Sequence, residues 1–175
     1  WLQSLATQTG FNLERRVLTA DGRTLWAHVH TVPMHSAQGA LSGFVATVED
    51  ITARKNAEEA LRRNEEKFRA TFDQAFQFIG LMDTQGILLD ANRTALSFAG
   101  IRPEDVIGKP FSESPWWQDP VEKAKLQKAV HTASAGQLVR FETSHPDADG
   151  TIHFIDFSLK PVLDEHGKVQ MLIPE

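Results

Sequence analysis

Cysteine and tyrosine are both absent from this 175-residue sequence. Without a thiol the chain has no disulfide, no thiolate zinc or iron–sulfur site, no cysteine nucleophile and no cysteinyl flavin adduct. An excess of positive charge is also lacking, because 18 basic residues stand against 23 acidic ones and the net charge is −5. A chain of this charge is poorly suited to a phosphate backbone, so we expect no nucleic-acid partner.

Long apolar runs are missing as well. Runs such as residues 44–48 are far shorter than the ~18 residues that a membrane-spanning helix needs. The sequence starts without methionine and shows no signal peptide. We therefore expect a cytoplasmic piece of a longer polypeptide, with no membrane segment of its own.

Motifs of known catalytic chemistry do not occur. The sequence has no Gly-x-Ser-x-Gly, no phosphate-binding loop and no pair of carboxylates at helical spacing. His28, His30 and His35 lie close together, but the sequence offers no acidic third ligand beside them. We predict neither catalytic residues nor a metal site, and hence a chain that is not an enzyme.

An internal repeat organises the chain. Four punctuating residues recur in register at an offset of 128 positions, and Glu14 falls on Glu142 at the same offset. Such self-similarity is the signature of a unit built twice. The recurring residues are Asp21-Gly22, Pro33 and Gly39 in the first copy and Asp149-Gly150, Pro161 and Gly167 in the second.

Each copy has the pattern of three antiparallel strands. Asp-Gly between extended segments indicates a hairpin, because glycine accepts a positive φ. We expect strands over residues 11–18, 23–34 and 40–49, and again over 138–144, 151–162 and 168–173. Only the second copy has a long stretch before it, so residues 1–50 are predicted to be the C-terminal half of a first domain. We expect that half to pack on another copy of the chain or to be its least stable part, since three strands seldom stand alone.

A long helix is predicted between the copies, within a linker at residues 51–76. Residues 53–75 contain neither glycine nor proline, and Asp50 or Thr52 can cap the helix N-terminus. Small or apolar side chains recur at spacings of four and three, which favours a weak coiled coil. A helix packed on its own domain is the alternative. The seam contains Ala57, Leu61, Asn64, Phe68, Phe72 and Ala75.

Residues 77–175 predict a second, nearly complete domain. A hairpin over 78–91 is followed by a short helix that Asn92 caps and Gly100 ends. Pro103 opens a further helical turn, and Asp119-Pro120 opens a helix that continues to about residue 133. The order of two strands, helices and three strands predicts an α+β fold with its helices on one side of the sheet.

This order resembles the PAS family of sensory domains, together with the C-terminal segment often called PAC. The resemblance rests on the Asn92 cap, Gly100, residues 103–108, the second copy's turn residues, and the string Val48-Glu49-Asp50-Ile51-Thr52. That string resembles the Asp-Ile-Thr exit that joins PAS domains to signalling helices. It implies that Asp50, Ile51 and Thr52, with Leu61 and Asn64 in the helix, relay a signal.

The resemblance also implies a five-stranded antiparallel sheet that faces short helices around a cavity. It further implies a homodimer formed through the linker helix and the sheet. A downstream histidine kinase, or less often a cyclic-dinucleotide enzyme, would be the output domain. We therefore predict a sensory or relay module. The alternatives are a structural dimerisation module without a ligand and a regulatory part of a diguanylate cyclase or phosphodiesterase.

A candidate ligand pocket is expected where the sheet meets the helices. The sequence does not decide between a filled core and a cavity for a small molecule, and each Trp of Trp116-Trp117 is more readily a structural plug. No cofactor is required. Non-covalent flavin beside Trp117 and haem on His131 stay open without being favoured. The candidate pocket residues are Phe98, Phe111, Trp117, Leu126, Val130, Phe141, Ile155, Phe157 and Leu159.

Overall fold

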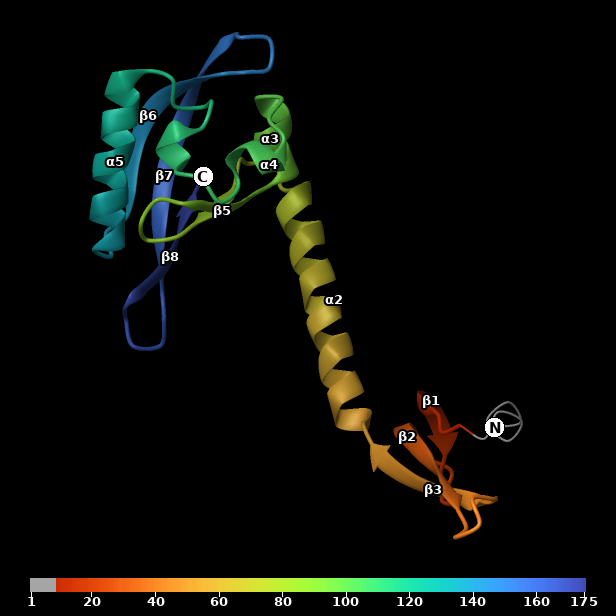
Figure 1. Cartoon of the computed structure of the whole chain (residues 1–175). Coiled ribbons are helices and arrows are strands. Elements are labelled where there is room, and N and C mark those ends of the chain that lie inside the picture. Colours follow the sequence, from red (N-terminus) through yellow and green to blue (C-terminus); the bar gives the residue numbers. More distant parts are fainter. Residues whose placement is uncertain (1–8) are drawn as a thin grey trace. The chain divides into compact units, whose positions relative to one another are not determined.

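The structure, a computed structural model, describes residues 9–175. The first eight residues of the predicted half-domain at 1–50 lie outside the described part. The chain divides into two compact units, with the division between Glu66 and Lys67 inside helix α2 (Figure 1). The predicted boundaries at residues 50 and 76 stay a prediction.

Unit 1 contains a three-stranded antiparallel sheet in the order β1-β2-β3. Its strands are β1 (Asn12–Leu18), β2 (Thr24–His35) and β3 (Leu41–Asp50). Tight turns join them, and Gly22 and Gly39 adopt φ values of 83° and 79° that favour glycine. Helix α2 (Thr52–Gln74) begins two residues after the last strand, as the sequence predicts.

Unit 2 contains a five-stranded antiparallel sheet in the order β5-β4-β8-β7-β6. The predicted fold class is therefore confirmed. The strands are β4 (Gly80–Met82), β5 (Leu88–Ala91), β6 (Val139–Pro146), β7 (Ile152–Leu163) and β8 (Val169–Pro174). Between β5 and β6 lie α3 (Arg93–Phe98), α4 (Pro103–Val106), the 3₁₀ turn η1 (Phe111–Glu113) and α5 (Pro120–Ser134) (Figure 1).

The internal repeat extends to the strand register. Glu14 pairs with His28 in unit 1, and the residues 128 positions later, Glu142 and Asp156, pair in unit 2. Each long hairpin has an irregularity at the equivalent point, between Met34 and His35 and between Val162 and Leu163. The two meanders thus share register as well as turn positions.

Capping side chains fix where the helices of unit 2 begin. The Asp119 carboxylate accepts hydrogen bonds from the backbone N–H groups of Val121 (2.7 Å) and Glu122 (3.2 Å), and Pro120 occupies the first turn of α5. These contacts satisfy backbone donors that have no partner within a helix. The predicted cap at Asn92 is present at α3, where the Asn92 side chain accepts from Ala95 N.

The hydrophobic core of unit 2 lies between the sheet and its helices. Leu126 of α5, Leu159 of β7, and Met82 and Leu172 of the central strands are fully buried. This core fixes how α5 lies against β6, β7 and β8. Within residues 9–175, no helix combines the length and the apolar character needed to cross a membrane.

We predict that Leu159→Ala lowers the free energy of unfolding by about 2–5 kcal/mol, because it leaves a cavity in a packed core. Urea unfolding measures this change. Leu163→Ala on the same strand is the matched control, since Leu163 is 53% exposed and its truncation should cost about 0.5 kcal/mol or less. Equal losses in the two variants would contradict this description of the core.

Candidate functional site

The junction between β3 and α2 is held by a compact set of hydrogen bonds within unit 1. The Asp50 carboxylate accepts from the backbone N–H of Thr52 at 2.9 Å, which caps the helix. The Thr52 hydroxyl in turn accepts from the backbone N–H of Trp26 at 2.9 Å. The Ile51 N–H donates to the Trp26 carbonyl, also at 2.9 Å, and Ile51 is 5% exposed. The three residues predicted as the exit of the sheet therefore tie the first turn of α2 to β2.

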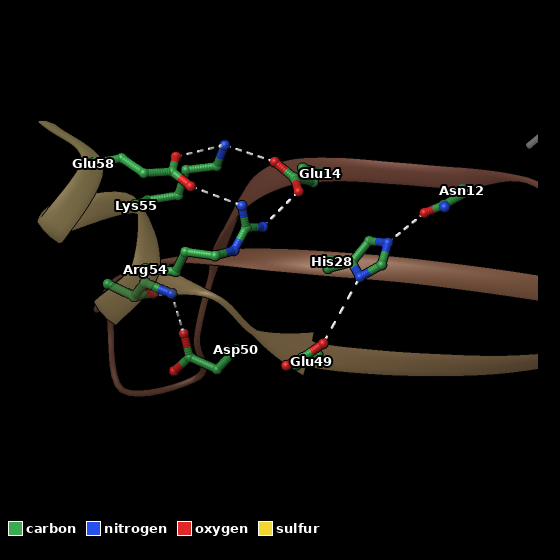
Figure 2. A network of polar contacts seen from close by, with 9 residues as sticks. Asn12, Glu14, His28, Glu49, Asp50, Arg54, Lys55 and Glu58 are labelled. Atoms are coloured by element: carbon green, nitrogen blue, oxygen red, sulfur yellow. Dashed lines mark hydrogen bonds and ion pairs between the residues drawn. The ribbon is translucent and has the colours of Figure 1, made fainter. Parts of the chain in front are cut away.

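Glu14 of β1 forms a second tie to the same turn (Figure 2). Its two carboxylate oxygens bind different cations, Arg54 at 2.6 Å and Lys55 at 2.7 Å. Both cations also reach Glu58, one turn further along the helix. We call Glu14, Arg54, Lys55 and Glu58 the junction clamp.

The junction clamp changes the titration of its own carboxyl group. Hydrogen bonds from Lys55 and Arg54 lower the pKa of Glu14 to about 2. The pKa of Asp50 is lowered too, chiefly by its hydrogen bond with Thr52. Both groups are therefore carboxylates at neutral pH, and the helix start is held by charge-assisted bonds.

His28 lies beside the junction clamp on β2 and contacts two other strands (Figure 2). It hydrogen-bonds Asn12 of β1, and its Nδ1 lies 3.8 Å from a carboxylate oxygen of Glu49 on β3. The strand register thus provides an acidic neighbour that sequence spacing did not indicate. Even so, no group of three or more metal-ligating side chains comes together among residues 9–175.

The C-terminal end of α2 is fastened inside unit 2. The Asn92 side-chain amide donates to the carbonyls of Phe72 (3.0 Å) and Gln77 (2.8 Å). Arg69 of α2 also forms an ion pair with Asp90 at 2.8 Å. Both ends of the helix are thus joined to a sheet by polar contacts.

The two predicted relay residues in the middle of α2 lie on its surface. Leu61 is 70% exposed, and Asn64 is also exposed. Phe68, further along the same stripe, is 43% exposed and stacks on Phe72 with ring centroids 5.1 Å apart. Phe72 is the one buried residue of this helix. An apolar stripe is therefore available for contact with another chain.

A small cavity of about 50 Å³ lies within unit 2. Aromatic rings from η1, the following loop and β7 form much of its wall, and Gly80, Ala91 and Ala95 form part of the remainder. An apolar cavity of about 150 Å³ is large enough to bind benzene, so a space of about 50 Å³ suits a molecule of no more than about three heavy atoms. Its wall favours an apolar occupant.

Three of the predicted pocket residues, Phe111, Ile155 and Phe157, line this cavity. Leu126 and Leu159 are fully buried in the core instead, and Val130 and Phe141 pack at its border. The Phe98 ring packs against Phe78, which lines the cavity, and against His153, but Phe98 itself does not line it. Trp117 is 3% exposed and contacts the rings of Phe111, Phe141, His145 and Phe157.

Sequence reasoning missed several wall residues. Trp116, rather than its neighbour Trp117, reaches the cavity, and His145 lines it from β6. The period of two along β6 places His145 on the same face as Phe141, so strand alternation could have found it. Gly80 and Ala91 carry no comparable signal in the sequence, because the side chains around a small residue decide whether it lines a cavity. The further wall residues are Phe78, Ile79, Leu88, Ala95, Pro174 and Glu175.

His145 is the titratable side chain most closely associated with the rings around the cavity. Its Nδ1 lies 2.7 Å from the carbonyl oxygen of Trp116, and its ring meets Trp117 edge to face. Burial lowers its pKa, because the charged form loses hydration. A neutral imidazole that donates from Nδ1 fits this site and holds the loop to β6.

Neither flavin nor haem fits this cavity. Drug-sized ligands occupy pockets of roughly 300 Å³ or more, several times the space found here. His131, considered as a haem ligand, is exposed on α5 and does not line the cavity. The cavity suits a much smaller molecule.

Comparison with known families agrees with this architecture. The family model described as "PAS fold" matches residues 72–173, and one described as "PAS domain" matches residues 2–53. The chain belongs to the PAS family of sensory domains. The resemblance noted in the sequence is thereby confirmed.

Curated relatives place these domains in signalling proteins. The chain is 38% identical over 128 residues to the sensor histidine kinase TmoS of Ectopseudomonas mendocina, covering 71% of this chain and 13% of that protein. It is 34% identical over 132 residues to the hybrid signal transduction histidine kinase D of Dictyostelium discoideum, covering 74% and 8%. The chain thus spans about a tenth of the relatives' length, and it is a sensory signalling module.

Solved structures show the same fold. A PAS domain of an HTR-like protein from Haloarcula marismortui has a TM-score of 0.56 at 18% identity, over 69% of this chain and 95% of that one. The Vibrio cholerae protein VqmA, solved bound to DPO, has a TM-score of 0.52 at 28% identity, over 60% of this chain and 52% of that one. The first of these likenesses concerns the fold alone.

We predict that the junction clamp persists well below neutral pH. Glu14 has a lowered pKa in the folded chain, so its contribution to stability is present above the unfolded value of about 4.3 and is lost as the pH falls toward 2. A carbon-detected NMR titration of Glu14 measures this pKa. In the double variant Arg54→Gln/Lys55→Gln the pKa should return to about 4.3. An unchanged pKa in that variant would contradict the junction clamp.

Proposed function

We propose that this chain is the sensory and signal-relay part of a dimeric sensor histidine kinase, in which helix α2 carries the signal. The identity to two histidine kinases supports the class of protein. The observation that carries the relay is that polar contacts fasten α2 at both ends while its middle is exposed. Kinase activity would belong to a domain outside this chain. A cytoplasmic location stays a prediction.

The relay would begin where β3 runs into α2. Ile51 and Thr52 bind β2, Asp50 of β3 accepts from the Thr52 N–H, and Glu14 binds the first helical turn from β1. A shift of strands in this sheet would therefore move the helix start, because four separate bonds connect them. A helix passes such a displacement along its length more readily than a loop does.

Dimerisation would place the exposed stripe of α2 against the same stripe of a second copy. Leu61 and Phe68 supply its apolar contacts, and the polar Asn64 between them limits its strength, as a polar seam residue does in coiled coils. A weak seam can change register at low energetic cost. The sheet of unit 2 would contribute as well, since Phe154 on β7 is 89% exposed.

The stimulus would be a small apolar molecule in the cavity of unit 2. Its aromatic wall and its volume of about 50 Å³ support that class of ligand. VqmA, which is similar in fold and 28% identical over part of its length, was solved bound to DPO, so a protein that is similar to this chain holds a ligand. A larger molecule would have to displace wall side chains such as Trp116.

The dimer seam predicts opposite effects for two substitutions. Leu61→Glu should weaken dimerisation of the full chain about tenfold or more, because it places like charges in the apolar stripe. Asn64→Leu should strengthen it. Sedimentation equilibrium measures both. Ala70→Glu, on the opposite side of the helix, is the control and should leave the dimer constant unchanged; a loss as large as that of Leu61→Glu would contradict the seam.

A small molecule that binds in the cavity should raise the Tm of the chain, and a larger side chain in place of Ala95 should prevent this rise. Cyclopropane, with three heavy atoms, should raise the Tm by about 2 °C at saturation. Ala95→Val places extra carbons in the cavity and should abolish that rise. Ala99→Val, which follows the same helix but lies off the cavity wall, should retain it.

Two outcomes separate the alternatives for this module. If the Tm of the native chain does not respond to cyclopropane while the dimer persists, the ligand part of the proposal is wrong and a structural dimerisation module is favoured. If cyclopropane raises the Tm equally in Ala95→Val and Ala99→Val, the ligand binds elsewhere.

A further inference from the structure

We infer that Asn92 is the positioning residue through which the wall of the cavity acts on helix α2. The inference rests on the proposed function, because it assumes that an occupant of the cavity is the stimulus. It adds a second input to the relay, at the end of α2 opposite to the junction clamp.

Asn92 is fully buried, and its side chain makes four hydrogen bonds. Its Nδ2 donates to the carbonyls of Phe72 in α2 and Gln77 in the following connection, at 3.0 and 2.8 Å. Its Oδ1 accepts from the backbone N–H groups of Ile79 and Ala95, at 3.2 and 3.0 Å. A capping aspartate or serine would satisfy only the second pair, so the amide is needed for the contact with α2.

The backbone of Asn92 reinforces these links. Its N–H donates to the carbonyl of Ile79 at 2.8 Å, and its carbonyl accepts from Leu96 in α3 at 3.1 Å. One residue thus joins the end of α2, the strand pair β4–β5 and the first turn of α3. A buried polar group with all its partners is costly to disturb, so these segments move together.

The residues bonded or adjacent to Asn92 are also cavity wall. Ile79, Ala91 and Ala95 line the cavity, as does Gly80 next to Ile79. Gly80 is closely packed against its neighbours: a Cβ added there would lie 2.9 Å from Pro174 Cγ and 3.3 Å from the Asp90 carbonyl oxygen. An occupant that pushes on this side of the cavity therefore displaces the partners of the Asn92 side chain.

Three exposed or half-buried contacts accompany Asn92 at the same end of α2. Arg69 pairs with Asp90, the Arg93 N–H donates to Asp73 at 3.1 Å, and the Thr94 hydroxyl donates to the Ala75 carbonyl at 2.6 Å. Solvent competes for these groups, whereas it does not reach Asn92. They fasten the helix end, and the buried amide links that end to the cavity.

Asn92→Asp tests the link with little change of shape. The carboxylate keeps the acceptor for Ile79 and Ala95 and remains a good helix cap, but it loses both donors to the α2 side. Amide hydrogen exchange in the last turn of α2 should become about tenfold faster. Asp90→Asn, which removes the ion pair to Arg69 and leaves Asn92 intact, is the matched control.

The deciding measurement uses xenon, a probe that enters dry apolar cavities, and amide NMR of the whole chain. In the native chain xenon should shift amide signals of Gly80, Ala91 and Ala95 and also those of residues 70–74. In Asn92→Asp the wall shifts should remain while those at 70–74 fall about threefold or more. Asp90→Asn should retain both the wall shifts and the shifts at residues 70–74. If the contacts at this end of α2 only anchored the helix, loss of the ion pair in Asp90→Asn would weaken the shifts at residues 70–74 as well.

The two ways to fail are distinguishable. Wall shifts that never reach residues 70–74 in the native chain, or that reach them equally in Asn92→Asp, would overturn the role of Asn92 and leave the proposed ligand site intact. No xenon shift at the wall would overturn the ligand site and this inference with it.

Discussion

Helix α2 is held at its two ends and almost nowhere between. Its first turn binds a sheet through Asp50, Thr52 and Glu14, and its last turn binds another through Asn92. A helix with one buried residue in 23 gains little from packing, so its position depends on these polar contacts. A change in either sheet would therefore move the end of the helix that is bonded to it. The proposed relay and the proposed role of Asn92 both depend on this constraint.

The repeat shows how one framework accommodates different surfaces. Asn12 and His28 hydrogen-bond across β1 and β2, and the equivalent residues Arg140 and Asp156 form an ion pair across β6 and β7. The diagonal contact is retained while its chemistry changes from polar to charged. The strand register and the turns are the same in the two copies, whereas the outward-facing side-chain pairs differ.

Much of this fold was predictable because it depends on local chemistry. Glycines in tight turns and the Asn92 and Asp119 caps each act over a few residues, and the strands and α-helices lie within about two residues of their predicted places. The 128-residue offset indicated which strands pair, because two copies of one sequence pattern should have the same strand pairing. Helix α2 followed from the lack of glycine and proline.

The site was less predictable because it depends on distances that sequence does not contain. Phe111, Ile155 and Phe157 reach the cavity, whereas Leu126 and Leu159 are equally apolar and fill the core. Trp116 lines the cavity, whereas Trp117, the predicted candidate, packs in the core, because the loop that carries both residues orients them. Asn92 was predicted as a cap, but its bonds to Phe72 and Gln77 depend on where α2 ends in space.

The size of the cavity limits how strongly any occupant can bias the module. About three heavy atoms fit within 50 Å³, and even the most efficient small ligands gain no more than about 1.5 kcal/mol per atom, or roughly 4.5 kcal/mol in all. Converting a population from 1:99 to 99:1 requires about 5.5 kcal/mol of differential binding. On the proposed function, an occupant of this cavity supplies less than that, so a complete switch requires resting populations of the two states that differ by less than 99 to 1.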